Sequence, residues 1–362
     1  MSFTDLGKAV GLSTSAVHQR VRRLEEREVL LGYAARVAHD QLGAPLTAFV
    51  CMSLLSVGLR DDPVVHSGLR FLRQSVRPDG SWPIDTNLSV WVTSLSLTAL
   101  AAAGVEPPEA ERTRQWLAAR QVRLRHPFTD AAPGGWGWSH LSGAVPDADD
   151  TSGALLALGD RLDEASRAAG VQWLLDLQNS DGGWPTFCRG WGQLPFDQSC
   201  DDLTAHALRA LVVGAPASSR PAVERGLPST QQAVARGLAY LRARQRPDGA
   251  WVPLWFGNQS TPDQQNPVLG TARVLAALAR VHPEGDMARR GREYLLAAQN
   301  DDGGWGGGAG ASSTVEETAL AVTGLAGWPD ETREALRRGA AYLAARVERG
   351  DWTDATAIGL YF

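Results

Sequence analysis

The chain has 362 residues, enough for two domains or one sizeable core, with a net charge of -5 and a pI near 5.8. This acidic balance argues against nucleic-acid binding along the whole chain, and three irregularly spaced cysteines exclude a disulfide framework or thiolate zinc site. No apolar stretch reaches the length of a bilayer span, and no signal pattern opens the chain. We therefore expect a cytoplasmic protein and leave open a peripheral contact at the inner face of the membrane.

The first 57 residues differ in periodicity from the rest and predict a helix-turn-helix segment. Residues 4–10 are typical of a short helix, 11–12 of a turn and 13–28 of a second helix. In such a segment the second helix lies in the DNA major groove and contacts bases or phosphates. The side chains expected to make these contacts are those of Ser15, His18, Gln19, Arg20, Arg22 and Arg23.

The pattern LSTSAVHQRVRRLEE in this segment resembles the DNA-binding end of the Lrp/AsnC regulators. The resemblance implies that residues 33–37 and 46–53 are strands, namely the hinge strand and the first strand of the effector domain. We expect residues 1–57 to be a truncated form of this unit with a short β extension. Paired half-sites need a dimer, so we expect any DNA binding to be weak.

From residue 58 to 362, one pattern repeats. A helix-like run carrying Gln ends in Gly-x-Trp or Gly-Gly-Trp, and an apolar Ala/Leu-rich helix follows. Two copies are degenerate: residues 114–136 have a longer loop before the Trp, and residues 338–352 lack the Gln. The repeat of roughly 50 residues has the length of a two-helix unit. The repeats end at Trp82, Trp136, Trp184, Trp251, Trp305 and Trp352. We interpret these tryptophans as structural, with the Gln amide tying each outer helix to its successor.

The second, apolar helices are predicted over residues 93–103, 151–159, 203–212, 270–279, 318–326 and 354–362. Most begin at or just after an acidic residue, Ser or Thr, as a helix N-cap requires. Outer helices that alternate with inner ones six times close most simply into a barrel. The sequence therefore predicts an all-α fold, an (α/α)6 barrel over residues 58–362.

Three carboxylates stand immediately before the second inner helix, at Asp147, Asp149 and Asp150. Helix capping and dipole compensation explain such a cluster without any function. Crowded carboxylates cannot all ionise cheaply, however, so one tends to stay protonated near neutral pH. Such an acid at the open end of a barrel suits the protonation of a carbon–carbon double bond, which is a very weak base.

A second acidic element lies one repeat later, at Asp202 and His206. These residues are four apart and share one helix face. A helical histidine is often a satisfied core residue. Its place at the start of the neighbouring inner helix also makes it a candidate partner for the aspartate cluster.

At these residues the chain resembles the squalene–hopene cyclases, a family of class II terpene cyclases. DADDT matches the DxDD acid motif of that family, and the Gln…Gly-x-Trp repeats match its QW motifs. The stretches WPIDTNLSVW, LWFGNQ and VEETALA also resemble bacterial members. The resemblance implies a terpenoid cyclase/prenyltransferase-like toroid.

The resemblance also implies roles for individual residues. Asp149 is the proton donor, Asp147 and Asp150 support it, and Asp202 with His206 tunes it. The aromatic residues expected to stabilise carbocations through their π faces are Trp138, Phe187, Trp255 and Phe362. The implied substrate is a linear polyprene, with squalene giving a hopene-like triterpene as the first choice. No metal, diphosphate ionisation or redox cofactor is implied.

Members of this family carry a second α-barrel, and the cavity lies between the two barrels. We expect this chain to contain only one, so a polypeptide that supplies a second barrel domain is a candidate partner. The main alternative is a DNA-binding regulator whose barrel senses a lipid.

Other α/α-barrel enzymes fit less well. A protein prenyltransferase needs a zinc site, and Cys188 and Cys200 lack its spacing. An inverting glycosidase would pair Asp149 with Glu316 or Glu317 across a cleft. A class I terpene synthase would need a DDxxD motif, which the Asp201–Asp202 pair does not complete.

Overall fold

The computed structural model describes residues 44–76, 80, 87–126, 129–141, 144–189, 195–214, 230–351 and 358–360. The chain forms two units, Met1–Thr86 and Asn87–Phe362. The boundary lies further along the chain than residue 57, where the sequence composition changes. The predicted helix-turn-helix, with its six DNA-contacting residues, lies outside the described residues.

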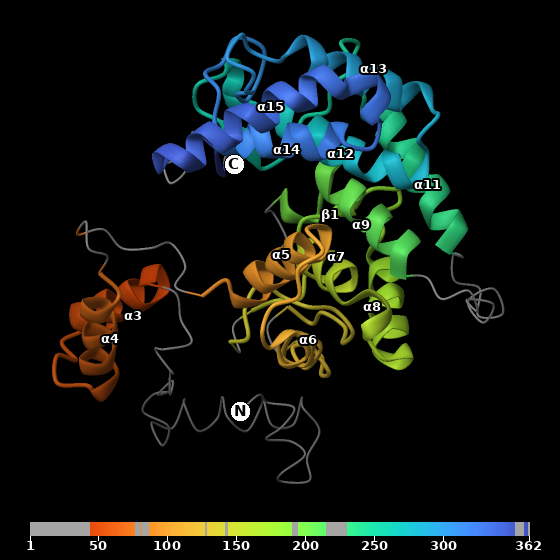
Figure 1. The fold of residues 1–362 in the computed structure, drawn as a ribbon. Helices are drawn as coiled ribbons and strands as arrows, with labels where there is room; N and C mark the ends of the chain where they lie inside the picture. The colour runs from red at the N-terminus through yellow and green to blue at the C-terminus, as the bar shows by residue number, and fades with distance from the viewer. Residues whose placement is uncertain are drawn as a thin grey trace. The chain divides into compact units, whose positions relative to one another are not determined.

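In the first unit, helices α3 (Ala44–Ser56) and α4 (Pro63–Gln74) pack against each other (Figure 1). Pro63 stands in the first turn of α4, and the Asp62 side chain accepts a hydrogen bond from the backbone N–H of Val64. The prediction of a strand over residues 46–53 is wrong, because this stretch lies inside α3. Its Ala, Leu and Met residues favour a helix, and packing on α4 buries Cys51 against Val65.

The second unit alternates outer and inner helices, which confirms the predicted all-α toroid. The inner helices are α5 (Ser89–Ala102), α7 (Ala148–Leu158), α9 (Asp201–Gly214), α12 (Pro267–Val281) and α14 (Val315–Leu325). The outer helices are α6 (Ala110–Ala118), α8 (Glu164–Leu177), α11 (Thr230–Arg244), α13 (Asp286–Ala297) and α15 (Pro329–Arg349). Short 3-10 turns cover Gly159–Arg161, Pro195–Asp197 and Pro262–Gln264.

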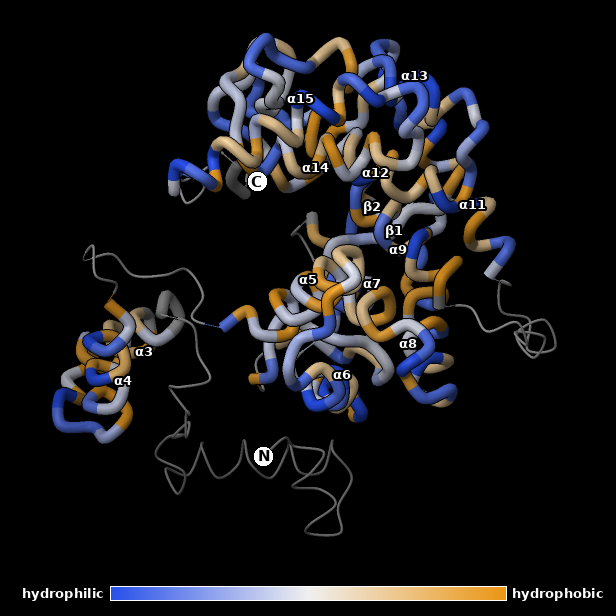
Figure 2. Tube along the Cα trace, in the orientation of Figure 1, coloured by the Kyte–Doolittle hydropathy of each residue, from blue (hydrophilic) through white to orange (hydrophobic). Residues whose placement is uncertain are grey.

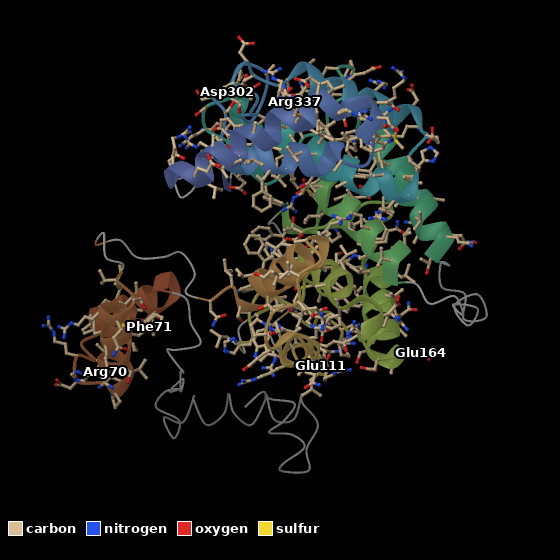
Figure 3. The ribbon with its side chains drawn as sticks, in the orientation of Figure 1. Arg70, Phe71, Glu111, Glu164, Asp302 and Arg337 are labelled. Atoms are coloured by element: carbon tan, nitrogen blue, oxygen red, sulfur yellow. The ribbon has the colours of Figure 1, made fainter. Side chains whose placement is uncertain are left out.

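Each inner helix packs against the next along the chain, from α5 through to α14 (Figure 1). Small residues allow this close approach: a Cβ on Gly324 of α14 would lie 2.7 Å from the carbonyl oxygen of Ala272 on α12. Figure 2 shows the difference in hydropathy, with α6 and α13 largely hydrophilic and α5 and α14 rich in hydrophobic residues. Exposed charges such as Glu111, Glu164 and Arg337 lie on outer helices (Figure 3).

The repeated Gln-to-Trp element joins consecutive outer helices through hydrogen bonds. Gln178, after α8, donates its amide to the carbonyl of Gly182 in the turn, 2.8 Å away, and to that of Ala233 on α11, 2.9 Å away. Gln121, Gln245 and Gln299 make the same pair of bonds in their repeats. The turn glycine has a positive φ in all four, at Gly134, Gly182, Gly249 and Gly303.

The tryptophan that ends each of these four repeats is fully buried. The Trp251 indole N–H donates to the carbonyl of Leu241, 2.7 Å away, and the Trp251 backbone N–H donates to the Thr271 hydroxyl. Its ring lies over Gly291 of the next outer helix, where a Cβ would come within 2.9 Å of the indole. Trp82 and Trp352 lie outside the described residues. The tryptophan therefore fills the space between successive repeats.

Two short antiparallel pairs connect the loops at the helix ends. β1 (Trp184–Pro185) pairs with β2 (Ser199–Cys200), and β3 (Phe256–Asn258) pairs with β4 (Ile358–Leu360). The prediction of a sixth inner helix over residues 354–362 is wrong at 358–360, which form a strand. A helix this short gains little from its own hydrogen bonds, whereas β3 offers unpaired backbone groups as partners.

Candidate active site

The aspartate cluster begins helix α7, and its first member is a helix cap. Asp147 Oδ1 accepts a hydrogen bond from the backbone N–H of Asp150 at 2.7 Å. Asp147 and Asp150 are both buried, and their carboxyl groups also hydrogen-bond each other. The capping explanation is therefore right for Asp147. Asp149 lies in the first turn of α7 and has a different set of partners.

Three other inner helices bring partners to the Asp149 carboxyl. His206 Nδ1 on α9 lies 2.7 Å from Asp149 Oδ1, and Arg273 Nη1 on α12 lies 3.6 Å from the same oxygen. Trp91 Nε1 on α5 donates to Asp149 Oδ2 at 3.2 Å. The Asp149 side chain is 19% exposed, so these contacts occur in a largely desolvated site.

The contacts set the protonation of the cluster. Burial raises the pKa of Asp149, but His206, through its hydrogen bond and charge, and then Arg273 and Trp91 outweigh burial and hold that pKa well below its usual range. Burial, in contrast, raises the pKa of Asp147 to about 8 and that of Asp150 well above its usual range. The crowding argument holds, but the shared proton belongs to Asp147 and Asp150. The expectation of a neutral Asp149 is wrong, because the hydrogen bond to His206 and the nearby Arg273 guanidinium stabilise its carboxylate.

Arg273 connects the acid to a second group of residues. Its Nη1 lies 3.7 Å from Asp202 Oδ2, and its guanidinium lies 5.9 Å from the ring centroid of Phe256. The Cys200 thiol donates to Asp202 Oδ1 at 2.7 Å and accepts from the backbone N–H of Leu254. Burial and then the Asp202 charge raise the pKa of this thiol well above its usual range, so it stays a donor.

A cavity of about 240 Å³ lies between the inner helices, with the acid on its wall. The surface of the cavity is mainly apolar, although more than half of the lining residues are polar or charged. The residues are Trp91, Ser94, Leu95, Thr98, Asp149, Asp150, Gly153, Leu156, Asp202, His206, Arg209, Ala272, Arg273, Ala276, Leu320 and Thr323. The structure thus brings Asp149, Asp150, Asp202 and His206 together around one cavity, whereas Asp147 is buried and does not line it.

The predicted aromatic residues form a row beside this cavity rather than its wall. Trp138 contacts Phe187, Phe187 contacts Phe196, and Phe196 contacts Trp255, with centroid distances of 6.3, 5.0 and 5.1 Å. Phe196 and Trp255 pack with Phe256, which brings the row to Arg273. Phe362 lies outside the described residues.

Among the cavity residues that the sequence analysis missed, Arg209, Arg273 and Trp91 matter most for the chemistry. Arg209 and Arg273 are arginines inside Ala/Leu-rich helices that were predicted to be buried, and that contrast is the signal that could have identified them. Trp91 ends the stretch WPIDTNLSVW, and Leu95 and Thr98 follow it at helical spacing. Its closeness to Asp149, 58 positions along the chain, is a tertiary contact that spacing does not reveal.

The structure does not support the glycosidase alternative, because neither Glu316 nor Glu317 faces Asp149 across the cavity. Glu317 is fully buried and accepts hydrogen bonds from the side-chain amides of Asn258, at 2.6 Å, and Asn266, at 3.1 Å. It does not line the cavity, and neither does Glu316. Within the described ranges, no three His, Cys, Asp or Glu side chains are grouped to hold a metal ion. No helix among the described residues is long and apolar enough to cross a membrane.

The raised pKa of Asp147 predicts a stability that depends on pH. The unfolded chain loses this proton near pH 4, whereas the folded chain holds it to about pH 8, so the free energy of unfolding should fall as pH rises through this window. Asp147→Asn keeps the helix cap but cannot titrate, so we expect a shallower fall. Urea unfolding of both proteins at pH 5, 6.5 and 8 measures how steeply the free energy of unfolding falls with pH. Asp330→Asn, on the surface, should keep the wild-type slope, and an unchanged slope in Asp147→Asn would contradict the assignment.

Comparisons with known proteins agree with this geometry. The model of the squalene-hopene cyclase C-terminal domain matches residues 88–362, and the model of the AsnC-type helix-turn-helix domain matches residues 1–25. Both resemblances noted in the sequence are thereby confirmed at the level of family.

Individual proteins similar to the chain include a cyclase and two synthases by name. The squalene–hopene cyclase of Bradyrhizobium diazoefficiens is 30% identical, over 73% of this chain and 44% of that protein. The drimenyl diphosphate synthase of Streptomyces showdoensis is also 30% identical, over 79% of this chain and 49% of that protein. The ent-copalyl diphosphate synthase from Streptomyces platensis has a similar fold, with a TM-score of 0.57 and 24% identity, over 77% of this chain and 48% of that one.

The chain spans less than half of the length of each of these relatives. The family match nevertheless covers most of it, from the first inner helix onward. With the helical toroid and an aspartate cluster at the wall of its cavity, the chain belongs to the squalene–hopene cyclase C-terminal domain family.

Proposed function

We propose that this cavity protonates a carbon–carbon double bond of a linear polyprene and so starts its cyclisation, as in a class II terpene cyclase. The observation that carries the proposal is the setting of Asp149, which lies on the wall of a mainly apolar cavity in contact with His206 and Arg273. Squalene, giving a hopene-like triterpene, is the first candidate substrate.

The contacts of Asp149 suit a strong acid. An alkene accepts a proton only from an acid whose conjugate base is well stabilised, and His206 and Arg273 stabilise the carboxylate. His206 and Arg273 both contact Oδ1, so we expect the transferred proton to be carried by Oδ2. Among the described residues, the Trp91 indole N–H alone donates a hydrogen bond to Oδ2. An apolar chain that fills the cavity displaces water and thereby favours the protonated form.

The reaction balances without a co-reactant. The proton leaves Asp149, and the π pair of the double bond forms the new C–H bond, which leaves a tertiary cation. The π pair of the next double bond closes a ring and moves the cation along the chain. Loss of a proton from the last cation to water gives an isomer of the substrate. Trp91, on the cavity wall, offers a π face to these cations. The same role for Trp138, Phe187 and Trp255 remains a prediction, because these residues do not line the cavity.

Two further proposals concern partners. A polypeptide that supplies a second barrel domain would complete the enclosure of the cavity, and a peripheral membrane contact would give access to an apolar substrate. The alternative of a DNA-binding regulator remains a prediction, supported by the helix-turn-helix match over residues 1–25.

An assay of product formation tests the proposed function. Purified full-length chain in detergent should convert squalene or a shorter polyprene into a cyclic product of unchanged mass, detected by gas chromatography with mass spectrometry. We expect EDTA to leave the rate unchanged, because proton transfer from a carboxyl group needs no metal. The absence of a cyclised product from every polyprene offered would overturn the proposal.

A further inference from the structure

Arg209 occupies the same face of α9 as the residues around the acid. Asp202, His206 and Arg209 are spaced by four and then three positions, so they lie along one side of the helix, and all three line the cavity. His206 touches Asp149. Arg209 is one turn further from the helix N-terminus, about 4.5 Å along the helix axis.

Asp149 and Asp202 both have their cationic contact in Arg273 rather than in Arg209. Arg273 lies within 4 Å of both Asp149 and Asp202, and His206 contacts Asp149 as well. Among the residues that the structure describes, the Arg209 side chain has no hydrogen bond and no ion pair. Its charged neighbours are Arg273 and Arg280. Among the described residues, Arg209 therefore lines the cavity as a cation without an anionic partner.

An unbalanced cation at this place is unfavourable by itself. Burial, and after it the charges of Arg280 and Arg273, lower the pKa of Arg209, which means that its surroundings penalise the charged form. A guanidinium does not lose its proton in proteins under ordinary conditions, so the penalty persists until an anion offsets it. Leu156 and Leu320 on the facing helices are apolar and provide no such anion.

The lining therefore suits an occupant with two different ends. Its apolar body would lie against Leu95, Leu156 and Leu320, and its anionic end would face Arg209. Arg280, in the last turn of α12, lies seven positions beyond Arg273, about 10.5 Å along that helix. Positive potential thus extends from the region of the acid toward the opposite end of the inner helices.

We propose that Arg209 binds the anionic head group of a linear isoprenoid, while Arg273 and Arg280 add positive potential and the distal double bonds of the chain face Asp149. This inference rests on the proposed function and narrows its substrate class from a neutral hydrocarbon to an isoprenoid with a diphosphate or carboxylate end. A planar guanidinium binds either group through two parallel hydrogen bonds.

Binding of an unreactive ligand tests the inference separately from catalysis. Isothermal titration of the full-length chain with hexahydrofarnesyl diphosphate, the matching saturated carboxylic acid and hexahydrofarnesol compares three heads on one chain that has no double bond to protonate. We expect at least one anionic ligand to bind on the order of 10- to 100-fold more tightly than the alcohol. The tighter of the two identifies the head group.

The variant Arg209→Gln should remove most of this preference and leave the affinity for the alcohol unchanged. Arg333→Gln, an exposed arginine on α15, is the matched control and should keep the preference. Equal binding of the alcohol and both anions by the wild-type chain would overturn the inference, as would a preference that survives in Arg209→Gln. If the wild-type chain cyclises squalene but binds the anionic ligands no more tightly than the alcohol, the inference about Arg209 is overturned and the proposed function stands.

Melting temperatures provide a second test, which remains informative even if Arg209→Gln folds poorly. Inorganic pyrophosphate should raise the melting temperature of the wild-type chain by mass action and have a smaller effect on Arg209→Lys, which keeps the charge but not the fork of donors. Arg209→Gln without ligand should be at least as stable as wild type, because a partly buried cation without an anionic partner among the described residues is removed. Strong destabilisation by Arg209→Gln, with no effect of pyrophosphate on the wild type, would assign Arg209 a structural role and refute the inference.

Discussion

Replacement of Asp149 by Asn should lower the rate of cyclisation by on the order of 10²- to 10⁴-fold, the range expected when a general acid is removed. Asn has nearly the same shape, and its amide oxygen still accepts the hydrogen bond from His206, but it has no acidic proton to give. The measurement is the initial rate of product formation from a polyprene that the wild-type chain converts.

The control for this experiment is Asp160→Asn, since the Asp160 side chain is 99% exposed and remote from the cavity. It should keep the wild-type rate. The melting temperature of Asp149→Asn has to show a folded protein, because the change removes a carboxylate that lies 3.6 Å from Arg273. Product formation at the wild-type rate by folded Asp149→Asn would remove Asp149 as the acid.

The largest expected effect on stability is that of Trp251→Ala. The side chain is fully buried, its indole N–H donates to Leu241, and its ring fills the space over Gly291. Removal of a buried tryptophan leaves a cavity and an unpaired carbonyl, so we expect a loss of about 3–5 kcal/mol in the free energy of unfolding. The midpoint and slope of guanidinium unfolding measure it.

Trp116→Ala is the matched comparison, because Trp116 is only partly buried on α6 and ends no repeat. Its ring packs against His140 and the Arg120 guanidinium, and we expect its loss to cost about 1 kcal/mol. A Trp251→Ala variant no less stable than Trp116→Ala would show that the repeat tryptophans do not hold the toroid together.

Periodicity predicted most of the architecture. The Gln…Gly-x-Trp repeat indicated alternating outer and inner helices, and the structure places α5, α7, α9, α12 and α14 within four residues of the predicted inner starts. The observed starts come two to four residues earlier. Helix caps explain part of this shift, since Asp147, Asn266 and Thr314 cap their helices before the predicted first residue.

Two errors have one cause. Residues 46–53 were predicted as a strand because of a resemblance to a regulator, and 354–362 as a helix because of the repeat, yet the structure shows α3 for the first and β4 at 358–360 for the second. Short segments have weak preferences of their own, so packing on α4 in one case and pairing with β3 in the other decides their conformation.

The sequence by itself determined the toroid of helix pairs, because repeat spacing is a local property of the chain. The choice of Asp149 as the acid, with His206 as its partner, came from the resemblance to the DxDD motif and remains a prediction. Only the tertiary structure decided which carboxyl group keeps a proton. Arg273 and Trp91 reach Asp149 from helices far away in sequence, while Asp147 and Asp150 face each other in a buried pair. A pKa depends on burial and on charges within a few ångströms, and those distances exist only once the inner helices have packed.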